Sequence, residues 1–161
     1  MGLLDEKDCR DIRDMKRLIL GCGKHHVKQE NEITVDILSF PCVDIVADLN
    51  LAWPFEDNSV ESISAIHLVE HLDSLIHFMN ESWRVLKPGG SLYLETPLAG
   101  GDVDLEWADP THKRCYRLHT FVNYFSLEGI DRFGYTDRGW NFFYLAVVNN
   151  CIIIHAYPLK N

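Results

Sequence analysis

The sequence has no apolar stretch long enough to cross a membrane, which needs about 20 such residues in a row. Its longest apolar segment, FFYLAVVNNCIII, is interrupted by Asn149 and Asn150. The first residues, MGLLDEKDCRDIRD, carry too many charges for a secretory signal peptide. These absences argue against an integral membrane protein and against a secreted protein, so we expect a cytoplasmic location.

Paired cysteines and basic runs are also missing. The five cysteines are scattered and never form C-x-x-C, so the sequence indicates neither a zinc ribbon nor a redox pair. Lys and Arg number 15 against 24 Asp and Glu, which gives a net charge of −9. Because nucleic acid binding depends on Lys and Arg contacts with phosphates, we do not expect a long nucleic acid as substrate.

The sequence does contain short strand-like segments separated by turns. Apolar or β-branched runs predict strands at 17–23, 32–38, 43–49, 60–66 and 91–97, and residues 73–86 have helical spacing. Two apolar runs around Asn149 and Asn150 predict a hairpin. We therefore expect a single domain over residues 1–161, built on a mostly parallel α/β sheet that ends in an antiparallel hairpin.

Small and acidic residues fall at the ends of the first three predicted strands. Gly21 allows a tight turn, and Gly23 allows the backbone to approach a ligand closely. Asp36 ends the second strand, where a carboxylate can accept hydrogen bonds from ribose hydroxyls, and Asp48 ends the third. Since ligands of open α/β sheets bind beyond the carboxyl ends of the strands, this ordered set predicts a nucleotide-like ligand.

Five segments in this order resemble one family. LILGCG, VDI, DIVADLN, WPFEDNSVESISAIHLVEHL and RVLKPGGSLYLETP are similar to segments of class I S-adenosylmethionine-dependent methyltransferases of the "methyltransferase type 11" group. The segment DPTHKRCYRLHTFVNYF also looks like one that recurs in a compact subgroup. The resemblance implies a Rossmann-like class I methyltransferase sheet and an enzyme that transfers a methyl group from S-adenosylmethionine to a small-molecule or protein acceptor.

The resemblance also implies roles for particular residues. Glycines 21 and 23 would line the methionine part of the cofactor, residue 36 would hold the ribose, and residues 48 and 49 would contact the adenine. Residue 67 follows the fourth strand, where the family places groups beside the sulfonium and the substrate. The cofactor-binding residues implied in this way are Gly21, Cys22, Gly23, Asp36, Ile37, Asp48, Leu49 and His67.

The segment AIHLVEHL admits another interpretation. His67, Glu70 and His71 spell H-x-x-E-H, the inverted zinc-protease pattern, in which two histidines on one helix bind the metal. A zinc hydrolase is therefore a remote alternative. Because VESISAI is strand-like up to His67, we expect the histidines to straddle a strand–helix junction instead, and we assign no residue to a metal site.

The chain departs from the family between its first strands. Residues 24–31 separate Gly23 from the second strand, whereas a parallel crossover usually takes about a dozen residues or more. We therefore expect the first crossover helices to be shortened or absent. This would leave one sheet face to be covered by an N-terminal helix over 3–16 or by a second copy in a homodimer. The loss also makes a catalytically inactive binding module the main alternative function.

The acceptor side is predicted within residues 100–117. Asp109, Arg114 and Tyr116 are candidate substrate residues, because Arg can clamp a carboxylate or phosphate. For an acceptor that must lose a proton, His67 and His112 are the candidate catalytic bases, since imidazole titrates near neutral pH. A divalent metal held by His112 with Asp102, Asp104 or Asp109 is a further alternative at this position.

Overall fold

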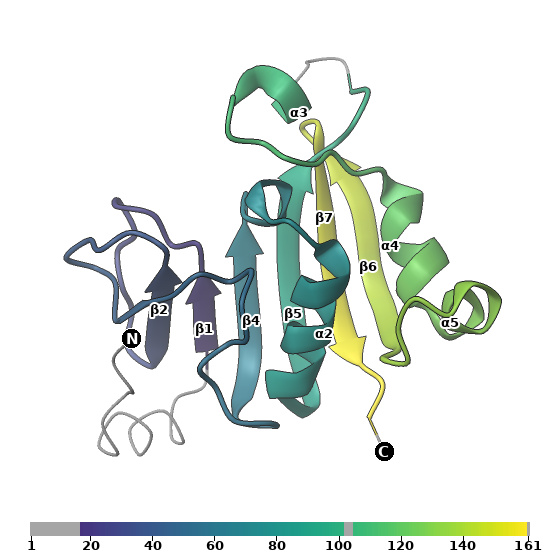
Figure 1. The fold of residues 1–161 in the computed structure, drawn as a ribbon, viewed down its shortest axis with the longest axis horizontal. Helices are drawn as coiled ribbons and strands as arrows, with labels where there is room; N and C mark the ends of the chain where they lie inside the picture. The colour runs from purple at the N-terminus through teal and green to yellow at the C-terminus, as the bar shows by residue number, and fades with distance from the viewer. Residues whose placement is uncertain (1–16, 102–104, 161) are drawn as a thin grey trace.

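A computed structural model describes residues 17–101 and 105–160 and shows a seven-stranded sheet in the order β3-β2-β1-β4-β5-β7-β6 (Figure 1). Strands β1 to β5 are parallel, and β7 runs antiparallel between β5 and β6. This confirms the predicted mostly parallel sheet with a C-terminal hairpin. The strands are β1 Arg17–Leu20, β2 Glu32–Asp36, β3 Ile45–Val46, β4 Val60–Ile66, β5 Leu86–Pro97, β6 Trp140–Val148 and β7 Cys151–Pro158.

The first crossovers are loops, as the sequence predicted. Between β1 and β4 the described chain contains turns and bends but no helix. The segment from Lys24 to Glu30 is polar and charged, so it has no apolar stripe that a crossover helix would bury against the sheet. Strand β3 is only two residues long, which leaves Asp48 in the loop that follows it rather than at the strand end.

All helical elements of the described residues follow β4 in the chain. The helical elements are η1 Val69–His71, α2 Leu75–Val85, α3 Leu105–Ala108, α4 Leu118–Phe125 and α5 Leu127–Phe133. Figure 1 shows α2 in front of the strands, α4 and α5 beside β6, and α3 above the upper ends of the strands. Helix α2 begins where Ser74 Oγ accepts a hydrogen bond from the His77 backbone N–H, and it buries Phe78 and Met79 in a core shared with Leu92 and Leu94 of β5. None of the helices in the described part of the chain is long and apolar enough to cross a membrane.

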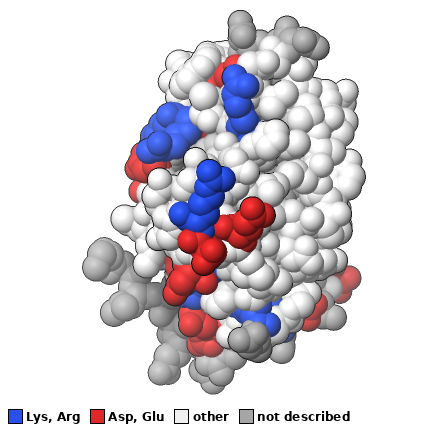
Figure 2. Space-filling view, turned by 90° about the vertical axis from the view of Figure 1, so that its right-hand side faces the viewer, with Lys and Arg blue, Asp and Glu red and all other residues white. Residues whose placement is uncertain are grey.

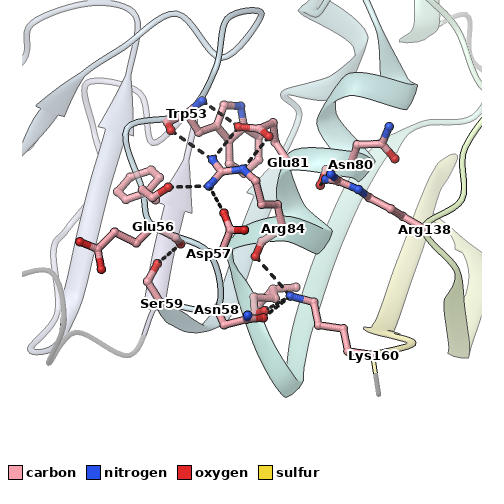
Figure 3. A network of polar contacts seen from close by, with 12 residues as sticks. Trp53, Glu56, Asp57, Asn58, Ser59, Asn80, Glu81, Arg84, Arg138 and Lys160 are labelled. Atoms are coloured by element: carbon pink, nitrogen blue, oxygen red, sulfur yellow. Dashed lines mark hydrogen bonds and ion pairs between the residues drawn. The ribbon is translucent and has the colours of Figure 1, made fainter.

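The loop between β3 and β4 is fastened to α2 by a polar network (Figure 3). Arg84 donates two hydrogen bonds of 2.8 Å to the Glu81 carboxylate, and its remaining N–H groups reach the carbonyls of Trp53 and Phe55 and the carboxylate of Asp57. The indole N–H of Trp53, a buried side chain, donates to the carbonyl of Leu49 at 3.1 Å. This network positions the residues that follow β3 without a helix.

The opposite sheet face carries aromatic side chains. On β5, Leu92 and Leu94 face the core while Tyr93 points away from it, 4.8 Å from the His155 ring. Phe143 of β6 is 51% exposed and stacks on Tyr157 with ring centroids 4.5 Å apart. Figure 2, which views the β6 edge, shows a broad area with few charged side chains.

No helix covers this second face within residues 17–101 and 105–160 (Figure 1). The helix predicted for residues 3–16 lies outside the described residues. Cover by a second copy of the chain stays a prediction.

Candidate cofactor and active site

A pocket of about 250 Å³ opens at the carboxyl edge of the parallel strands. This volume lies slightly below the usual range for ligand pockets, about 300–1,000 Å³. The pocket brings together residues that follow β1, β2, β3 and β4, and one residue from the segment after β5. Its lining consists of Gly21, Asp36, Ile37, Ala47, Asp48, Leu49, Asn50, His67, Leu68, His71, Leu72 and Lys113.

Most of the predicted cofactor residues therefore meet at one place. Cys22 instead lines a neighbouring cavity together with Ile19 and Ser64. Gly23 lies outside the lining but is tied to it, because its backbone N–H donates to Asp36 Oδ2 at 2.8 Å. Asn50 and Lys113 line the pocket without having been predicted. Asn50 directly follows Asp48 in the matching DLN segment, whereas nothing local in the sequence points to Lys113.

The turn after β1 needs glycine. Gly21 has a φ of +64°, and its N–H donates to the Val35 carbonyl at 2.9 Å. A Cβ atom at this position would lie 2.9 Å from Leu68 Cδ1, closer than carbon atoms normally approach. Gly23 also has a positive φ, +65°, where side chains are disfavoured. The turn therefore requires glycine at position 21 and favours it at position 23. The backbone hydrogen bond from Gly21 to Val35 holds the turn against β2.

Two carboxylates face the pocket. Asp36 Oδ1 accepts a hydrogen bond from the Leu38 N–H at 3.0 Å, in addition to the bond from Gly23 to Oδ2. Asp48 Oδ1 accepts from both the backbone and the side-chain N–H of Asn50, at 2.9 and 3.0 Å. Because each carboxylate oxygen can accept more than one hydrogen bond, these groups keep the capacity to bind hydroxyl or amino groups of a ligand.

His67 occupies the first position after β4, in a left-handed conformation with a φ of 51°. Its Nδ1 lies 3.2 Å from Glu70 Oε1, and its Nε2 lies 3.6 Å from Glu95 Oε1. Glu70 is 1% exposed, and its Oε2 accepts a hydrogen bond from Thr96 Oγ1 at 3.0 Å. The hydrogen bond with Glu70 raises the pKa of His67, burial lowers it, and the charges of Glu70 and Glu95 add to the increase, so the net direction is upward.

The H-x-x-E-H histidines diverge. Strand β4 ends at Ile66 and η1 spans Val69–His71, so the motif crosses a strand–helix junction as predicted. The His71 ring packs edge-on against His112, with centroids 4.7 Å apart, and its Nδ1 lies 3.0 Å from Thr111 Oγ1. Among the described residues, no cluster suited to a metal ion contains both His67 and His71. This geometry gives no support to the zinc-hydrolase alternative.

The predicted substrate residues lie beside the pocket rather than in its lining. Backbone N–H groups of Lys113 and Arg114 donate to the Glu70 carbonyl at 2.8 and 3.1 Å, which holds this segment against η1. Tyr116 is buried and donates its hydroxyl to the Val69 carbonyl at 3.1 Å, and burial raises its pKa to about 12. Asp109 accepts hydrogen bonds from Thr111 within a turn.

A second cavity, of about 320 Å³, is lined by Arg114 and Tyr116 together with Asp73 and aromatic residues of α4. Lys113, which lines the first cavity, forms an ion pair of 2.8 Å with Asp73, which lines the second. Asp102 and Asp104, which entered the alternative metal set with His112, lie outside the described residues.

Comparisons with known proteins bear on the family and the fold. Residues 18–94 match the model of the family described as "Methyltransferase domain". A search of curated proteins gave no match. Among solved structures, a SAM-dependent methyltransferase from Archaeoglobus fulgidus aligns with a TM-score of 0.61 at 16% identity, over 94% of this chain and 90% of that one.

Two further structures have the same fold. A SAM-dependent methyltransferase from Aquifex aeolicus aligns with a TM-score of 0.58 at 17% identity, over 94% of this chain and 87% of that one. A complex between the Haloferax volcanii Trm112 methyltransferase activator and a protein assigned as a methyltransferase aligns with a TM-score of 0.63 at 11% identity. The alignment covers 94% of this chain and 88% of that one. These likenesses establish the class I methyltransferase fold.

Proposed function

We propose that this chain, which has the class I methyltransferase fold and matches the methyltransferase-domain family over residues 18–94, binds S-adenosylmethionine and transfers its methyl group to an acceptor. The observation that carries the proposal is the single pocket that joins Gly21, Asp36 and Asp48 at the carboxyl ends of neighbouring strands. This is the edge at which open α/β sheets bind their ligands.

Each part of the pocket has a role in this proposal. The backbone around Gly21 and Gly23 approaches the methionine part, where side chains would obstruct it. Asp36 accepts hydrogen bonds from the ribose hydroxyls, while Asp48 and the apolar surface of Leu49 receive the adenine. When bound, the cofactor supplies an activated methyl group. Holding an acceptor in line with that group contributes roughly 7–11 kcal/mol to lowering the barrier.

In this proposal, the methyl acceptor lies at the side of the pocket that His67 lines. Of the two histidines predicted as bases, His67 lines the pocket and His112 does not. The bond with Glu70 raises the pKa of His67, so the imidazole keeps its proton to higher pH than a free histidine would. The neutral form of His67, which is the form that can take a proton from an acceptor, is therefore reached at a higher pH than in a free histidine.

A binding module without turnover is the second candidate. The observations that favour it are the missing crossover helices and the small volume of the pocket. The helix N-terminus that would face the cofactor after β1 is replaced by a loop, so one stabilising contribution to anion or ligand binding is lost.

The test of the proposed function is calorimetric titration of the full chain with S-adenosylmethionine and S-adenosylhomocysteine. We expect saturable binding of both in the micromolar range, at one site per chain. Absence of binding up to millimolar concentrations would contradict the proposal. Binding followed by no transfer of a labelled methyl group to candidate thiols, amines and hydroxyls would favour the binding module.

A further inference from the structure

We infer that His67, Glu95 and Cys151 form a zinc-binding site next to the proposed cofactor pocket. His67 directly follows β4, Glu95 lies in β5 and Cys151 begins β7, and these three strands are neighbours in the sheet. One donor atom from each lies within 4.8 Å of the other two. The site departs from the sequence-based expectation that no residue binds a metal.

Sheet pairing explains why these side chains meet. The His67 N–H donates to the Glu95 carbonyl at 2.9 Å, which continues the parallel pairing of β4 with β5 by one residue. Across the antiparallel pair of β5 and β7, Pro97 is opposite Cys151. Glu95 lies two residues before Pro97, so its side chain is on the same face and diagonal to Cys151.

The distances suit a tetrahedral ion. With bonds of about 2.0–2.2 Å to nitrogen and oxygen, a tetrahedral zinc ion holds two such ligands roughly 3.4 Å apart. His67 Nε2 and Glu95 Oε1 are 3.6 Å apart. The Cys151 sulfur lies within 4.8 Å of the donor atoms of the other two residues.

Two of the proposed ligands, His67 and Glu95, are oriented by hydrogen bonds to further side chains. His67 Nδ1 is bonded to the buried carboxylate of Glu70, which is itself fixed by Thr96, and Glu95 Oε2 accepts a hydrogen bond from the Tyr93 hydroxyl at 3.0 Å. Metal-binding histidines almost always donate their second N–H to a carboxylate, carbonyl or water in this way.

The orientation of the His67 ring is compatible with a metal ion. With Nδ1 directed to Glu70, Nε2 faces the Glu95 carboxylate at 3.6 Å. In the neutral tautomer protonated at Nδ1, Nε2 carries the lone pair that would bind the metal ion.

The donor set selects zinc over harder cations. One nitrogen, one carboxylate oxygen and one sulfur are typical zinc ligands, whereas calcium and magnesium prefer oxygen alone. A second group, Glu70 with His71 and His112, is less suitable. Both carboxylate oxygens of Glu70 are already engaged, by His67 and by Thr96.

Three protein ligands leave a fourth position for an exchangeable molecule, as in catalytic zinc sites. The His67 side chain is 47% exposed, so solvent and small molecules reach the site. If the proposed methyl transfer holds, on which this step alone rests, the fourth ligand is the acceptor, and a thiol is the class that zinc activates best. The thiol releases its proton to solvent on coordination. Its sulfur lone pair then attacks the methyl carbon as the carbon–sulfonium bond breaks, leaving S-adenosylhomocysteine.

The test uses the full chain without a polyhistidine tag. Zinc content is measured by mass spectrometry, and affinity by competition with a chromophoric chelator. We expect one zinc per chain and a loss of affinity of more than about 100-fold in Cys151→Ser and Glu95→Gln, because both remove a ligand. Tyr93→Phe, which removes only a supporting hydrogen bond, should cost about 10-fold. The matched control is Cys115→Ser, which replaces an exposed thiol outside the cluster and should leave zinc binding unchanged.

Cobalt substitution gives a second readout. The cobalt-loaded protein should show a thiolate-to-cobalt charge-transfer band that disappears in Cys151→Ser and persists in Cys115→Ser. Circular dichroism checks folding, and if Cys151→Ser does not fold, Glu95→Gln carries the test. A wild-type chain without stoichiometric zinc, or variants that keep it, would overturn the site. Cofactor titration of zinc-loaded and stripped protein separates the two proposals, because zinc binding without cofactor binding contradicts only the proposed function.

Discussion

Replacing Asp36 by Asn should weaken binding of S-adenosylhomocysteine on the order of 10- to 100-fold. The carboxylate is the group placed to accept hydrogen bonds from the ribose hydroxyls, and it lines the pocket with Oδ2 bonded to the Gly23 N–H and Oδ1 to the Leu38 N–H. Hydrogen bonds to a charged group contribute about 1.5–3 kcal/mol, and about 1.4 kcal/mol changes a dissociation constant tenfold. Calorimetric titration of the variant measures the change.

Asp36 also fixes the glycine turn through Gly23, so its loss could act through loop geometry. A ligand analogue that lacks the ribose hydroxyls distinguishes the two causes. Wild-type protein should bind this analogue more weakly than S-adenosylhomocysteine, whereas Asp36→Asn should bind both alike. The matched control is Asp131→Asn, which removes the same charge from an exposed position of α5. An unchanged dissociation constant in Asp36→Asn would remove Asp36 from the cofactor site.

Replacing Arg84 by Met should lower the free energy of unfolding by about 2–3 kcal/mol. The substitution keeps an aliphatic side chain but removes the bidentate pair with Glu81 and the bonds to the carbonyls of Trp53 and Phe55 (Figure 3). Breaking a buried charge pair costs about 3–5 kcal/mol, and the partial exposure of Arg84, 20%, reduces this figure. Urea denaturation measures the loss, which corresponds to roughly 5–10 °C in the thermal midpoint.

Two variants separate the contributions to this loss. Arg84→Lys retains the charge but not the planar fork, so its stability should fall between wild type and Arg84→Met. In the double variant Arg84→Met with Glu81→Gln, part of the loss should be recovered because the largely buried carboxylate at position 81 is no longer left as an unpaired charge. Since the same network holds the loop that carries Asp48 and Leu49, we also expect weaker cofactor binding in Arg84→Met. An Arg84→Met variant as stable as the wild-type protein would show that the network contributes nothing to the free energy of unfolding.

The lowered pKa of Glu81 predicts how the stability of the protein depends on pH. Burial raises the pKa of Glu81, but the hydrogen bonds from Arg84 and from the Trp53 N–H outweigh it and lower the pKa below 4.5. A carboxyl group with a lowered pKa stabilises the folded state above its unfolded pKa, and this contribution disappears as the pH falls through the folded pKa. Wild-type protein should therefore lose stability below about pH 4.5 more steeply than Glu81→Gln. Equal slopes in denaturation series at several pH values would contradict this.

Local patterns predicted the strands and the turn that build the pocket. The strand over residues 60–66 has the predicted bounds, and Gly21 turns where the sequence placed the turn. The missing crossover helices were also predictable, because residues 24–31 are too few and too polar to form one. The divergence of His67 and His71 followed from the strand-like pattern that runs up to His67. These features depend on residues adjacent in the chain.

Other parts of the site depend on residues that are far apart in the chain. Tyr116 resembled a substrate residue, yet its ring is buried and its hydroxyl bonds the Val69 carbonyl. Lys113 reaches the cofactor pocket because the Glu70 carbonyl binds the backbone of its segment. No periodicity or motif encodes such contacts, since they arise from the packing of the segment after β5 against η1.

The sequence by itself determined a mostly parallel sheet, a glycine turn, carboxylates at the strand ends and the loss of the early helices. Each of these follows from local conformational preference and the alternation of apolar residues. Only the tertiary structure decided that Glu95 and Cys151 lie beside His67, and that Arg84 holds the loop of Asp48 in place. The reason is physical, because strand order and the packing of α2 against a distant loop are set by burial of the common core. That burial brings together side chains whose separation in the sequence carries no signal.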